Sequence, residues 1–298
     1  MRRFLLIGHP VGHSLSPAMH NAAFRRLGVE ATYAALDVDD PAALSGIIDQ
    51  LRQGQYAGAN VTIPHKVAVL DLMDEVTPRA RRMGAVNTIM AGPDGRLTGD
   101  NTDGYGLLTA IGEVTDRPVE RAVVFGAGGA ARACLVALAD AGATSVSLVA
   151  RNQERAEAML DAVDLPAATR VALVPWPTPG RPLPVLSEAA QADLLLNTTP
   201  VSLGETGASI LSPAQIATLQ RTNPRCLFAD LVYRPAITPF LRPWAEAGGT
   251  VATGLAVLLY QGAESFRLWL GGEAPVAAMA EAIGHASTHP LARSIGGA

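Results

Sequence analysis

The chain has 298 residues, of which 49% are hydrophobic, and it carries 23 Lys and Arg residues against 27 Asp and Glu residues. This length and apolar content suffice for two domains with buried cores, at roughly 150 residues per domain. Because the small acidic excess contains no long run of one charge, the composition argues against a nucleic-acid partner and favours a small molecule.

The N-terminus and the cysteines indicate a cytoplasmic protein without membrane contact. The apolar run at residues 4–7 is too short for the hydrophobic region of a signal peptide. Residues 254–270 contain Gln261, Glu264 and Arg267 and fall short of the roughly 20 apolar residues that cross a bilayer. Cys134 and Cys226 are isolated in the sequence, which suits a reducing compartment, and we expect both to be buried.

Short apolar runs alternate with helical patterns along the chain. Strands are expected at residues 3–8, 32–38, 121–125, 145–149 and 194–196, and helices at residues 18–27, 44–52, 67–73, 130–141 and 255–270. This alternation is typical of an α/β fold with parallel strands. The Pro-rich residues 165–184 are expected to form a surface loop or insertion, and residues 287–298 a frayed end.

A pair of serines lies between the first strand and the first helix. Ser14 and Ser16 are two residues apart, so in an extended chain their hydroxyl groups point the same way, and Pro17 suits the first position of the following helix. The pair could hold a carboxylate near a helix N-terminus. The alternative is that Ser16 is an ordinary N-cap.

A lysine follows a second strand. Lys66 comes after NVTIPH at residues 60–65 and is expected in the first turn of a helix over residues 67–73, where the helix dipole disfavours a cation. A lone lysine is usually a solvated surface charge. Beside an acid, however, it is equipped to transfer a proton to a carbonyl oxygen.

The candidate acid is Asp103, in GDNTDG at residues 99–104, immediately before a helix expected from Tyr105. A calcium loop is excluded because the twelfth position counted from Asp100 is Ile111, not Glu. Asp103 could instead serve only as an N-cap. The six histidines form no metal-binding pair, so no metal is expected.

A glycine-rich turn marks a nucleotide site. The expected strand at residues 121–125 runs into GAGGA at residues 126–130, which opens an apolar helix. Glycines let the backbone approach a pyrophosphate, and the helix N-terminus supplies free N–H groups. A tight turn without a ligand is the alternative, although strand, turn and helix occur in the order that the motif demands.

The next strand indicates which dinucleotide is bound. Versions that bind NAD place an acid at the tip of this strand, whereas versions that bind NADP place a cation there. The chain has no carboxylate at this tip, and Arg151 and Arg155 could bind a 2′-phosphate. NADP is therefore the expected cofactor, unless both arginines are merely solvated.

Taken in order, these segments resemble the shikimate dehydrogenase family over nearly the whole chain. The resemblance is carried by SLSP at residues 14–17, NVTIPHK at 60–66, GAVNT at 84–88, GDNTDG at 99–104 and GAGGA at 126–130. It implies an α/β substrate domain at residues 1–103, a Rossmann-type doubly wound NADP domain at 104–253, and C-terminal helices at 254–298 that return to the substrate domain.

The resemblance also implies a role for each matching residue. Lys66 and Asp103 would form the catalytic pair, and Ser14 and Ser16, with Tyr233, would hold the shikimate carboxylate. The ring hydroxyls would be bound by Thr62, Asn87, Asn101 and Gln261. The cofactor would be bound by Gly126, Ala127, Gly128, Gly129, Ala130, Ala150, Arg151, Asn152, Arg155, Asn197, Thr198, Thr199, Leu231 and Gly254.

Two local features bear on these roles. Gln261 lies at the edge of the apolar face formed by Leu258, Gly262, Phe266 and Trp269, so its amide needs a partner, which a polyol or the backbone could provide. At the strand tip the family often has Asn-Arg-Thr, whereas this chain has Ala150, Arg151 and Asn152.

The implied activity is the reversible NADPH-dependent reduction of 3-dehydroshikimate to shikimate, in chorismate and aromatic amino acid biosynthesis, by a monomer or homodimer. Two alternatives stay open. One is a quinate/shikimate dehydrogenase that uses NAD, against which the missing acid argues. The other is a non-catalytic regulator that binds shikimate or NADP, which would need neither Lys66 nor Asp103.

Overall fold

The computed structural model describes residues 1–176, 184–204 and 208–286. The chain divides into two compact units, one made of Met1–Gly106 and Leu259–Ala298 and the other of Leu107–Leu258. It passes from one unit to the other within helices α4 (Asp103–Val114) and α10 (Gly254–Leu270). The domain boundaries expected after residues 103 and 253 stay predictions. None of the helices described is long and apolar enough to cross a membrane.

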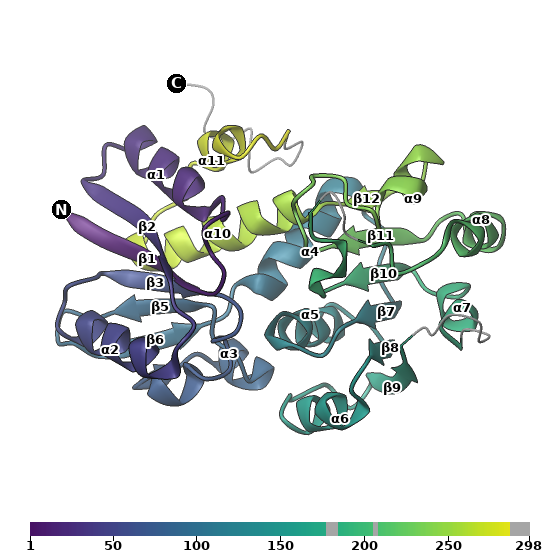
Figure 1. Cartoon of the computed structure of the whole chain (residues 1–298), viewed down its shortest axis with the longest axis horizontal. Coiled ribbons are helices and arrows are strands. Elements are labelled where there is room, and N and C mark those ends of the chain that lie inside the picture. Colours follow the sequence, from purple (N-terminus) through teal and green to yellow (C-terminus); the bar gives the residue numbers. More distant parts are fainter. Residues whose placement is uncertain (177–183, 205–207, 287–298) are drawn as a thin grey trace. The chain divides into compact units, whose positions relative to one another are not determined.

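The first unit contains a six-stranded sheet in the order β2-β1-β3-β5-β6-β4 (Figure 1). Its strands are β1 (Arg2–Gly8), β2 (Ala31–Asp37), β3 (Gly58–Val61), β4 (Glu75–Val76), β5 (Thr88–Ala91) and β6 (Leu97–Asp100). Its helices, apart from the parts of α4 and α10, are α1 (Ser16–Arg26), α2 (Pro41–Arg52), η1 (Leu70–Leu72), α3 (Pro78–Met83) and α11 (Val276–Ala282).

The expectation of parallel strands is wrong for part of this sheet. β1 is parallel to β2 and β3, but β5 is antiparallel to both β3 and β6. The reason is the short connection between β5 and β6, where Gly95 adopts a φ of +81° and donates its N–H to the Gly92 carbonyl at 3.0 Å. A connection this short can join only antiparallel neighbours.

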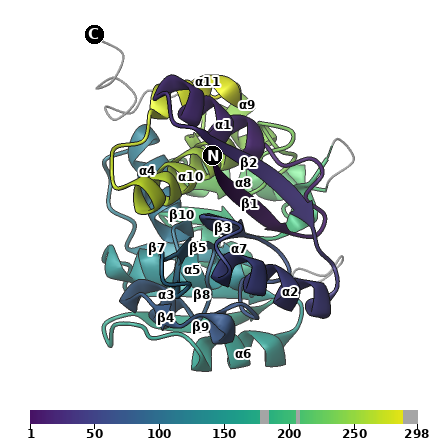
Figure 2. The same ribbon diagram turned by 90° about the vertical axis from the view of Figure 1, so that its left-hand side faces the viewer.

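Alternation along β1 sends side chains into two cores. Leu5 and Ile7 pack with the apolar residues of α2, including Leu44 and Leu51. Phe4 points to the other face, where its ring lies 5.4 Å from that of Phe24 on α1 and 4.8 Å from that of Trp269 on α10. The sheet is therefore covered by helices on both faces, and Figure 2 shows α1, α10 and α11 gathered apart from α2 and α3.

The second unit is an all-parallel sheet in the order β9-β8-β7-β10-β11-β12. Its strands are β7 (Arg121–Phe125), β8 (Ser145–Ala150), β9 (Arg170–Pro175), β10 (Leu194–Asn197), β11 (Leu227–Asp230) and β12 (Val251–Ala252). Its helices are α5 (Gly129–Asp140), α6 (Gln153–Asp161), α7 (Pro184–Ala189), η2 (Pro200–Ser202), α8 (Pro213–Thr222) and α9 (Arg242–Glu246). The chain starts in the middle and winds outward in both directions, which is the doubly wound Rossmann arrangement. This confirms the expected fold class.

The winding direction reverses between β7 and β10, and ligands of such sheets bind outside the carboxyl ends of the strands at that point. Phe125 and Asn197 are the last residues of these two strands and are paired with each other. The GAGGA turn and residues 197–199 therefore lie side by side at the edge where the fold expects a ligand.

Residues 165–184 are not one long loop, since Arg170–Pro175 forms strand β9 beside β8. Residues 177–183 and the C-terminal residues 287–298 lie outside the described part of the chain. Cys134 and Cys226 are buried, as expected.

Candidate active site

The edge of the first sheet collects most of the expected substrate residues. Ser14 and Ser16 follow β1, and Thr62 and Lys66 follow its parallel neighbour β3, so both segments leave the sheet at the same edge. β5 and β6 bring Asn87 and Asp103 to that edge, because Thr88 is paired with both Asn60 and Asp100.

The serine pair is held at the start of α1. Ser14 Oγ accepts the backbone N–H of Ser16 at 3.2 Å, and Ser16 is the first helical residue. The N-cap is Leu15, without a side-chain cap bond, so the N-cap alternative for Ser16 is wrong and Pro17 lies in the second helical position. Ser14 instead satisfies an N–H group that helix geometry leaves free.

The loop before these serines is anchored by a residue that the sequence reading missed. The Asp37 carboxylate, at the end of β2, accepts the Val11 N–H at 3.1 Å and lies 2.5 Å from Nδ1 of His9. The pKa of the Asp37 carboxyl is lowered by the hydrogen bonds from His9 and Val11. No motif announces this contact, because it joins neighbouring strands that are far apart in sequence.

Lys66 does not begin an α-helix, so the expected helix over residues 67–73 is wrong. The segment consists of turns and the short 3₁₀ helix η1, closed by bonds such as Leu70 N–H to the Val67 carbonyl at 3.2 Å. The physical reason is tertiary, because the Lys66 carbonyl accepts the N–H of Val86 at 2.8 Å instead of an intrahelical donor. A helix dipole therefore gives no account of Lys66.

Lys66 and Asp103 form an ion pair. Nζ of Lys66 lies 2.5 Å from Oδ2 of Asp103, and the two side chains are only 12% and 11% exposed. Asp103 starts α4, two residues earlier than expected, and its Oδ1 accepts a hydrogen bond from Nδ2 of Asn87 at 2.8 Å. The geometry thus places an ammonium group and an oriented carboxylate together, sheltered from most of the solvent.

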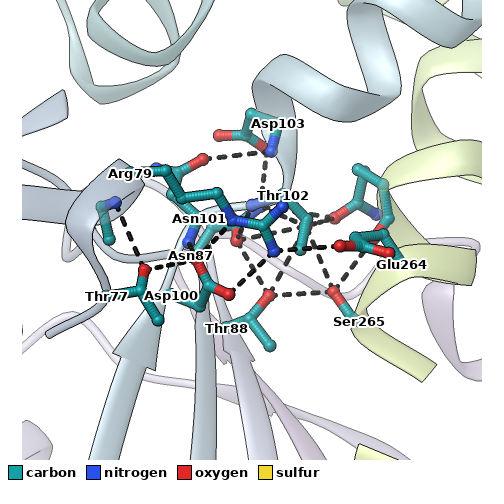
Figure 3. Close-up of polar contacts among 12 residues, drawn as sticks. Thr77, Arg79, Asn87, Thr88, Asp100, Asn101, Thr102, Asp103, Glu264 and Ser265 are labelled. Carbon is teal, nitrogen blue, oxygen red and sulfur yellow. Dashed lines mark hydrogen bonds and ion pairs between the residues drawn. The ribbon is translucent and has the colours of Figure 1, made fainter. Parts of the chain in front are cut away.

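A set of amides and hydroxyls lies beside Asp103 (Figure 3). Thr102 donates its N–H to Oδ1 of Asn87 at 2.8 Å, and Nδ2 of Asn87 lies 3.0 Å from Oγ1 of Thr102. Oε1 of Gln261 faces both residues, at 3.5 Å from Asn87 Nδ2 and 3.4 Å from Thr102 Oγ1. Oε1 of Gln261 therefore belongs to the polar rim beside Asp103, and its binding of a ring hydroxyl stays a prediction.

Two hydroxyl residues in this rim were not predicted. Ser265 accepts from Nδ2 of Asn60 at 3.0 Å and lies 2.8 Å from Oγ1 of Thr88. Its sequence signal is its position four residues after Gln261, on the same face of α10. Thr102 could have been found as the residue between Asn101 and Asp103.

Asn101 has a structural role in the described contacts. Its side chain is fully buried, its Oδ1 accepts the Asp103 N–H at 3.0 Å, and its Nδ2 donates to the Ala85 carbonyl at 3.0 Å. It therefore holds the start of α4, and contact with a ring hydroxyl stays a prediction. Thr62 is half-buried beside β1, donating its N–H to the Ile7 carbonyl at 2.8 Å.

Lysine usage is a further signal that the sequence reading missed. Lys66 is the only lysine in the sequence, and the other 22 of the 23 basic residues are arginines. Arginine stays protonated in proteins, whereas a lysine amine can release its proton. The single position at which this chain keeps an amine is thus the one beside Asp103.

The glycine-rich turn of the second unit leaves the N-terminus of α5 open. Gly126 has a φ of +115°, and a Cβ atom there would lie 2.5 Å from Oγ1 of Thr198, so only glycine fits. Gly128 is the N-cap of α5, without a side-chain cap bond and with open space where a Cβ would stand. Ala127, Gly129 and Ala130 complete the turn. Free N–H groups with space in front of them suit a pyrophosphate.

Arginines gather at the tip of β8. Among the described residues, no carboxylate pairs with Arg151 or Arg155, and Arg151 stacks on the Trp176 ring at 4.8 Å. Asn152 follows Ala150 and Arg151 and caps α6 by accepting the Arg155 N–H at 2.8 Å. Burial and the charge of Arg155 lower the pKa of Arg132 on α5, which identifies a third cation that the sequence reading missed.

The segment after β10 is built around a buried amide. Asn197 is fully buried, and its Oδ1 accepts the N–H of Thr199 at 2.9 Å. Thr198 donates Oγ1–H to the Phe125 carbonyl at 2.7 Å, which sets it against the glycine turn. Asn197 thus shapes the turn, and contacts of Thr198 and Thr199 with a cofactor stay predictions.

Asp230 supports the same region from β11. Its fully buried carboxylate accepts hydrogen bonds from Asn197 Nδ2 at 2.9 Å and Thr238 Oγ1 at 2.6 Å. Burial raises its pKa to about 6, although these hydrogen bonds act in the opposite direction. Leu231 and Tyr233 follow it and are half-buried. A Cβ at Gly254 would lie 2.3 Å from the Val232 carbonyl oxygen, so the backbone there must pass very close.

The described residues contain no cluster of three or more His, Cys, Asp or Glu side chains that could hold a metal ion.

Comparisons with known proteins match both ends of the chain and its full length. Residues 6–89 match the shikimate dehydrogenase substrate binding domain, and residues 254–283 match the shikimate 5′-dehydrogenase C-terminal domain. The NADP(+) shikimate dehydrogenase of Moorella thermoacetica is 44% identical over 294 residues, covering 96% of this chain and 95% of the relative.

Solved structures of shikimate and quinate dehydrogenases are also similar to this chain. Shikimate 5-dehydrogenase of Thermus thermophilus, in complex with NADP(H) and shikimate, superposes with a TM-score of 0.79 at 39% identity, covering 95% of this chain and 98% of that one. Quinate dehydrogenase of Corynebacterium glutamicum, in complex with NAD, gives a TM-score of 0.79 at 28% identity, covering 94% and 98%. Since a relative 44% identical aligns over almost its whole length, the chain belongs to the shikimate dehydrogenase family.

Proposed function

We propose that this protein is an NADP-dependent shikimate dehydrogenase, which reversibly reduces 3-dehydroshikimate to shikimate in chorismate and aromatic amino acid biosynthesis. The observation that carries the proposal is the sheltered Lys66–Asp103 pair, with Nζ and Oδ2 2.5 Å apart, at a sheet edge rich in amides and hydroxyls. The curated relatives with this name support it.

In this proposal the substrate ring lies against the edge of the first sheet. Ser14 and Ser16 hold its carboxylate at the start of α1, where free N–H groups favour an anion, and Tyr233 contributes a phenol. Thr62, Asn87 and Gln261 bind ring hydroxyls, since a polyol offers both donors and acceptors. Asn101 acts mainly by fixing the Asp103 backbone.

Lys66 is the proton donor in the reducing direction. Its ammonium gives a proton from Nζ to the oxygen of the reacting carbonyl, and in the reverse direction the neutral amine takes the proton from the hydroxyl. Asp103 accepts a hydrogen bond from Nζ and keeps it aimed, while Asn87 fixes the carboxylate in turn. When bound, NADPH supplies the hydride for the carbonyl carbon.

The second unit fits the cofactor. The open N-terminus of α5 suits the pyrophosphate. The residues of this turn that would bind it are Gly126, Ala127, Gly128, Gly129 and Ala130. The tip of β8 suits a 2′-phosphate, bound by Arg151 and Arg155 beside Ala150 and Asn152. The rest of the dinucleotide would be bound by residues that follow β10 and β11 and begin α10. These are Asn197, Thr198, Thr199, Leu231 and Gly254.

One set of assays tests the function against its rivals. Purified protein is given shikimate or quinate with NADP⁺ or NAD⁺, and reduced cofactor is followed by absorbance. We expect the highest kcat/KM for shikimate with NADP⁺, because no acid at the β8 tip is available for an NAD ribose. Preference for quinate with NAD⁺ would favour the first alternative. Tight binding without turnover would favour the regulator.

Light scattering during gel filtration distinguishes the expected monomer or homodimer from larger assemblies.

A further inference from the structure

A group of charged side chains beside the catalytic pair has no part in the chemistry proposed so far. Asp100 is the last residue of β6, and its carboxylate is 3% exposed. Its Oδ1 accepts hydrogen bonds from Thr77 Oγ1 at 2.6 Å, Arg79 Nε at 2.6 Å and the Asn101 N–H at 2.7 Å. Its Oδ2 accepts Arg79 Nη2 at 2.8 Å, so four donors fix one orientation of this carboxylate (Figure 3).

This orientation passes to Asp103 through Asn101. The Asn101 N–H is bound to the Asp100 carboxylate, and Asn101 Oδ1 accepts the N–H of Asp103. Both Asp100 and Asn101 are buried, with 2% and 0% of their surface exposed, so neither bond competes with bulk water. A shift of the Asp100 carboxylate therefore shifts the backbone that carries the catalytic acid.

Arg79 joins this turn to α10. The same Nη2 that binds Asp100 lies 3.0 Å from Oε1 of Glu264, whose carboxylate is 6% exposed. Glu264 is three residues beyond Gln261 on α10, so the two residues are neighbours on that helix. The Arg79 guanidinium thus connects the element that presents Asp103 with the element that presents Gln261.

The geometry of a guanidinium suits this task better than that of an ammonium. Two parallel N–H groups meet the two oxygens of Asp100, while a further N–H reaches Glu264, an arrangement that a single Nζ cannot reproduce. Arg79 itself is 34% exposed, so shortening it leaves no large buried cavity.

We propose that Arg79 is a positioning residue for the reaction, which fixes Asp103 through Asp100 and Asn101 and seats Gln261 through Glu264. Only its kinetic consequence rests on the proposed function. The link from Arg79 to the Asp103 backbone is independent of what the protein catalyses.

Arg267 provides a matched control. Its guanidinium binds the same Glu264 through two bonds of 2.7 and 2.9 Å, and it is 54% exposed. These two bonds both end on Glu264 and leave the Asp100 carboxylate to Arg79. Arg267→Gln and Arg79→Gln therefore remove the same charge and each deprive Glu264 of a partner, but only Arg79→Gln releases Asp100.

The kinetic experiment compares single-turnover reduction rates. We expect Arg79→Gln to slow the step on the order of 10- to 100-fold, with an unchanged Kd for NADP⁺ by calorimetry, because small misplacements of a catalytic group have effects of this size. Arg267→Gln should stay within about threefold of the wild type, because Arg79 still binds both Asp100 and Glu264 in that variant. Arg79→Lys should restore the melting temperature but not the rate, and it replaces Arg79→Gln if that variant does not fold.

A second readout does not need activity. Hydrogen exchange of the Asp103 amide, followed by NMR, should accelerate roughly tenfold or more in Arg79→Gln and stay unchanged in Arg267→Gln, because the local opening free energy falls only where the turn is released. An inactive wild type would refute the proposed function. The hydrogen exchange of the Asp103 amide would still test whether Arg79 fixes the Asp103 backbone.

Three results would overturn the inference. One is an equal loss of rate in the two glutamine variants, which would assign the effect to charge. Another is full rescue of the rate by Arg79→Lys. The last is an Asp103 amide that exchanges at the wild-type rate in Arg79→Gln.

Discussion

At the scale of single residues, the ammonium of Lys66 is the group whose chemistry no neighbour can replace. It is the only amine side chain of the protein and is paired with Asp103. We predict that Lys66→Ala lowers kcat by about 10²- to 10⁴-fold, which is the usual contribution of a positioned acid or base. NADP⁺ affinity and the circular dichroism spectrum should be retained, since the residues proposed to bind the nucleotide lie in the second unit.

Lys66→Arg separates charge from proton transfer. Arginine keeps the positive charge beside Asp103 but does not give up its proton. We expect this variant to melt at the wild-type temperature and to be as inactive as Lys66→Ala. Substantial activity in Lys66→Arg would mean that Lys66 acts only as a fixed charge.

The arginines at the β8 tip predict the cofactor preference. Removing a charge-assisted hydrogen bond to the 2′-phosphate, as in Arg155→Gln, should weaken NADP⁺ binding by about 10- to 100-fold. NAD⁺ serves as the internal control, because it lacks that phosphate and its Kd should barely change. Equal weakening of both cofactors, measured by calorimetry, would assign Arg155 a general role in the fold.

At the scale of elements, α1 buries a histidine without a polar partner. His20 is fully buried, and neither ring nitrogen has a hydrogen-bond partner among the described residues. Its ring stacks on that of Tyr33, with centroids 4.4 Å apart. Burial lowers the pKa of His20 to about 3, so the imidazole stays neutral in the folded protein.

This burial predicts a loss of stability in acid. Below its ordinary pKa of 6.5 the unfolded protein binds a proton at His20 that the folded protein excludes. Above pH 6.5 His20 leaves the free energy of unfolding unchanged. As the pH drops toward 3 the free energy of unfolding falls, by about 2 kcal/mol already at pH 5. Urea unfolding of the wild type and His20→Phe at pH 5 and 8 should show a smaller pH dependence in the variant. If the free energy of unfolding changed equally with pH in the wild type and in His20→Phe, the lowered pKa of His20 would be refuted.

Elements were predictable where local pattern and tertiary structure agree. Strand β7 was expected with its observed bounds, and α5 within one residue, because apolar runs and the glycine turn dictate both. The helix expected at residues 67–73 failed because the Lys66 carbonyl is bound by Val86, a contact that no local pattern contains. Strand β9 was hidden by prolines around it.

The candidate site followed the same rule. Asp103 stood out because its motif combines short polar residues with glycines, and Lys66 is brought to it by strand order. Asp37 and Arg79 were not found, because each acts on a segment remote in sequence, and a single arginine or aspartate on the surface is the commonest reading of such residues.

At the scale of the whole molecule, the second unit carries a buried acid whose pH response is opposite to that of His20. Burial raises the pKa of Asp230 to about 6, so the folded protein favours its neutral form. Stability from this group is present below pH 3.8 and is lost as the pH rises to about 6, by about 3 kcal/mol in total.

Asp230→Asn tests this trend. Thr238 and Val232 donate to different oxygens of Asp230, and the variant replaces one of these acceptors by an NH2 group, so it should be less stable than the wild type at pH 4. At pH 8 the deficit should shrink by about 2 kcal/mol, because only the wild type must then ionise a buried group. Calorimetric unfolding at both pH values measures the deficit, and a constant difference would contradict the raised pKa.

The first unit is discontinuous, since Leu107–Leu258 intervene before its last helices. During synthesis at roughly 5–20 residues per second, its sheet emerges many seconds before α10, which carries Gln261 and supplies Trp269 to cover Phe4. The nucleotide-binding unit can be complete while the substrate edge still exposes one apolar face. A nascent chain would thus be competent for the dinucleotide before it can hold the ring, and chaperones would meet it at that exposed face.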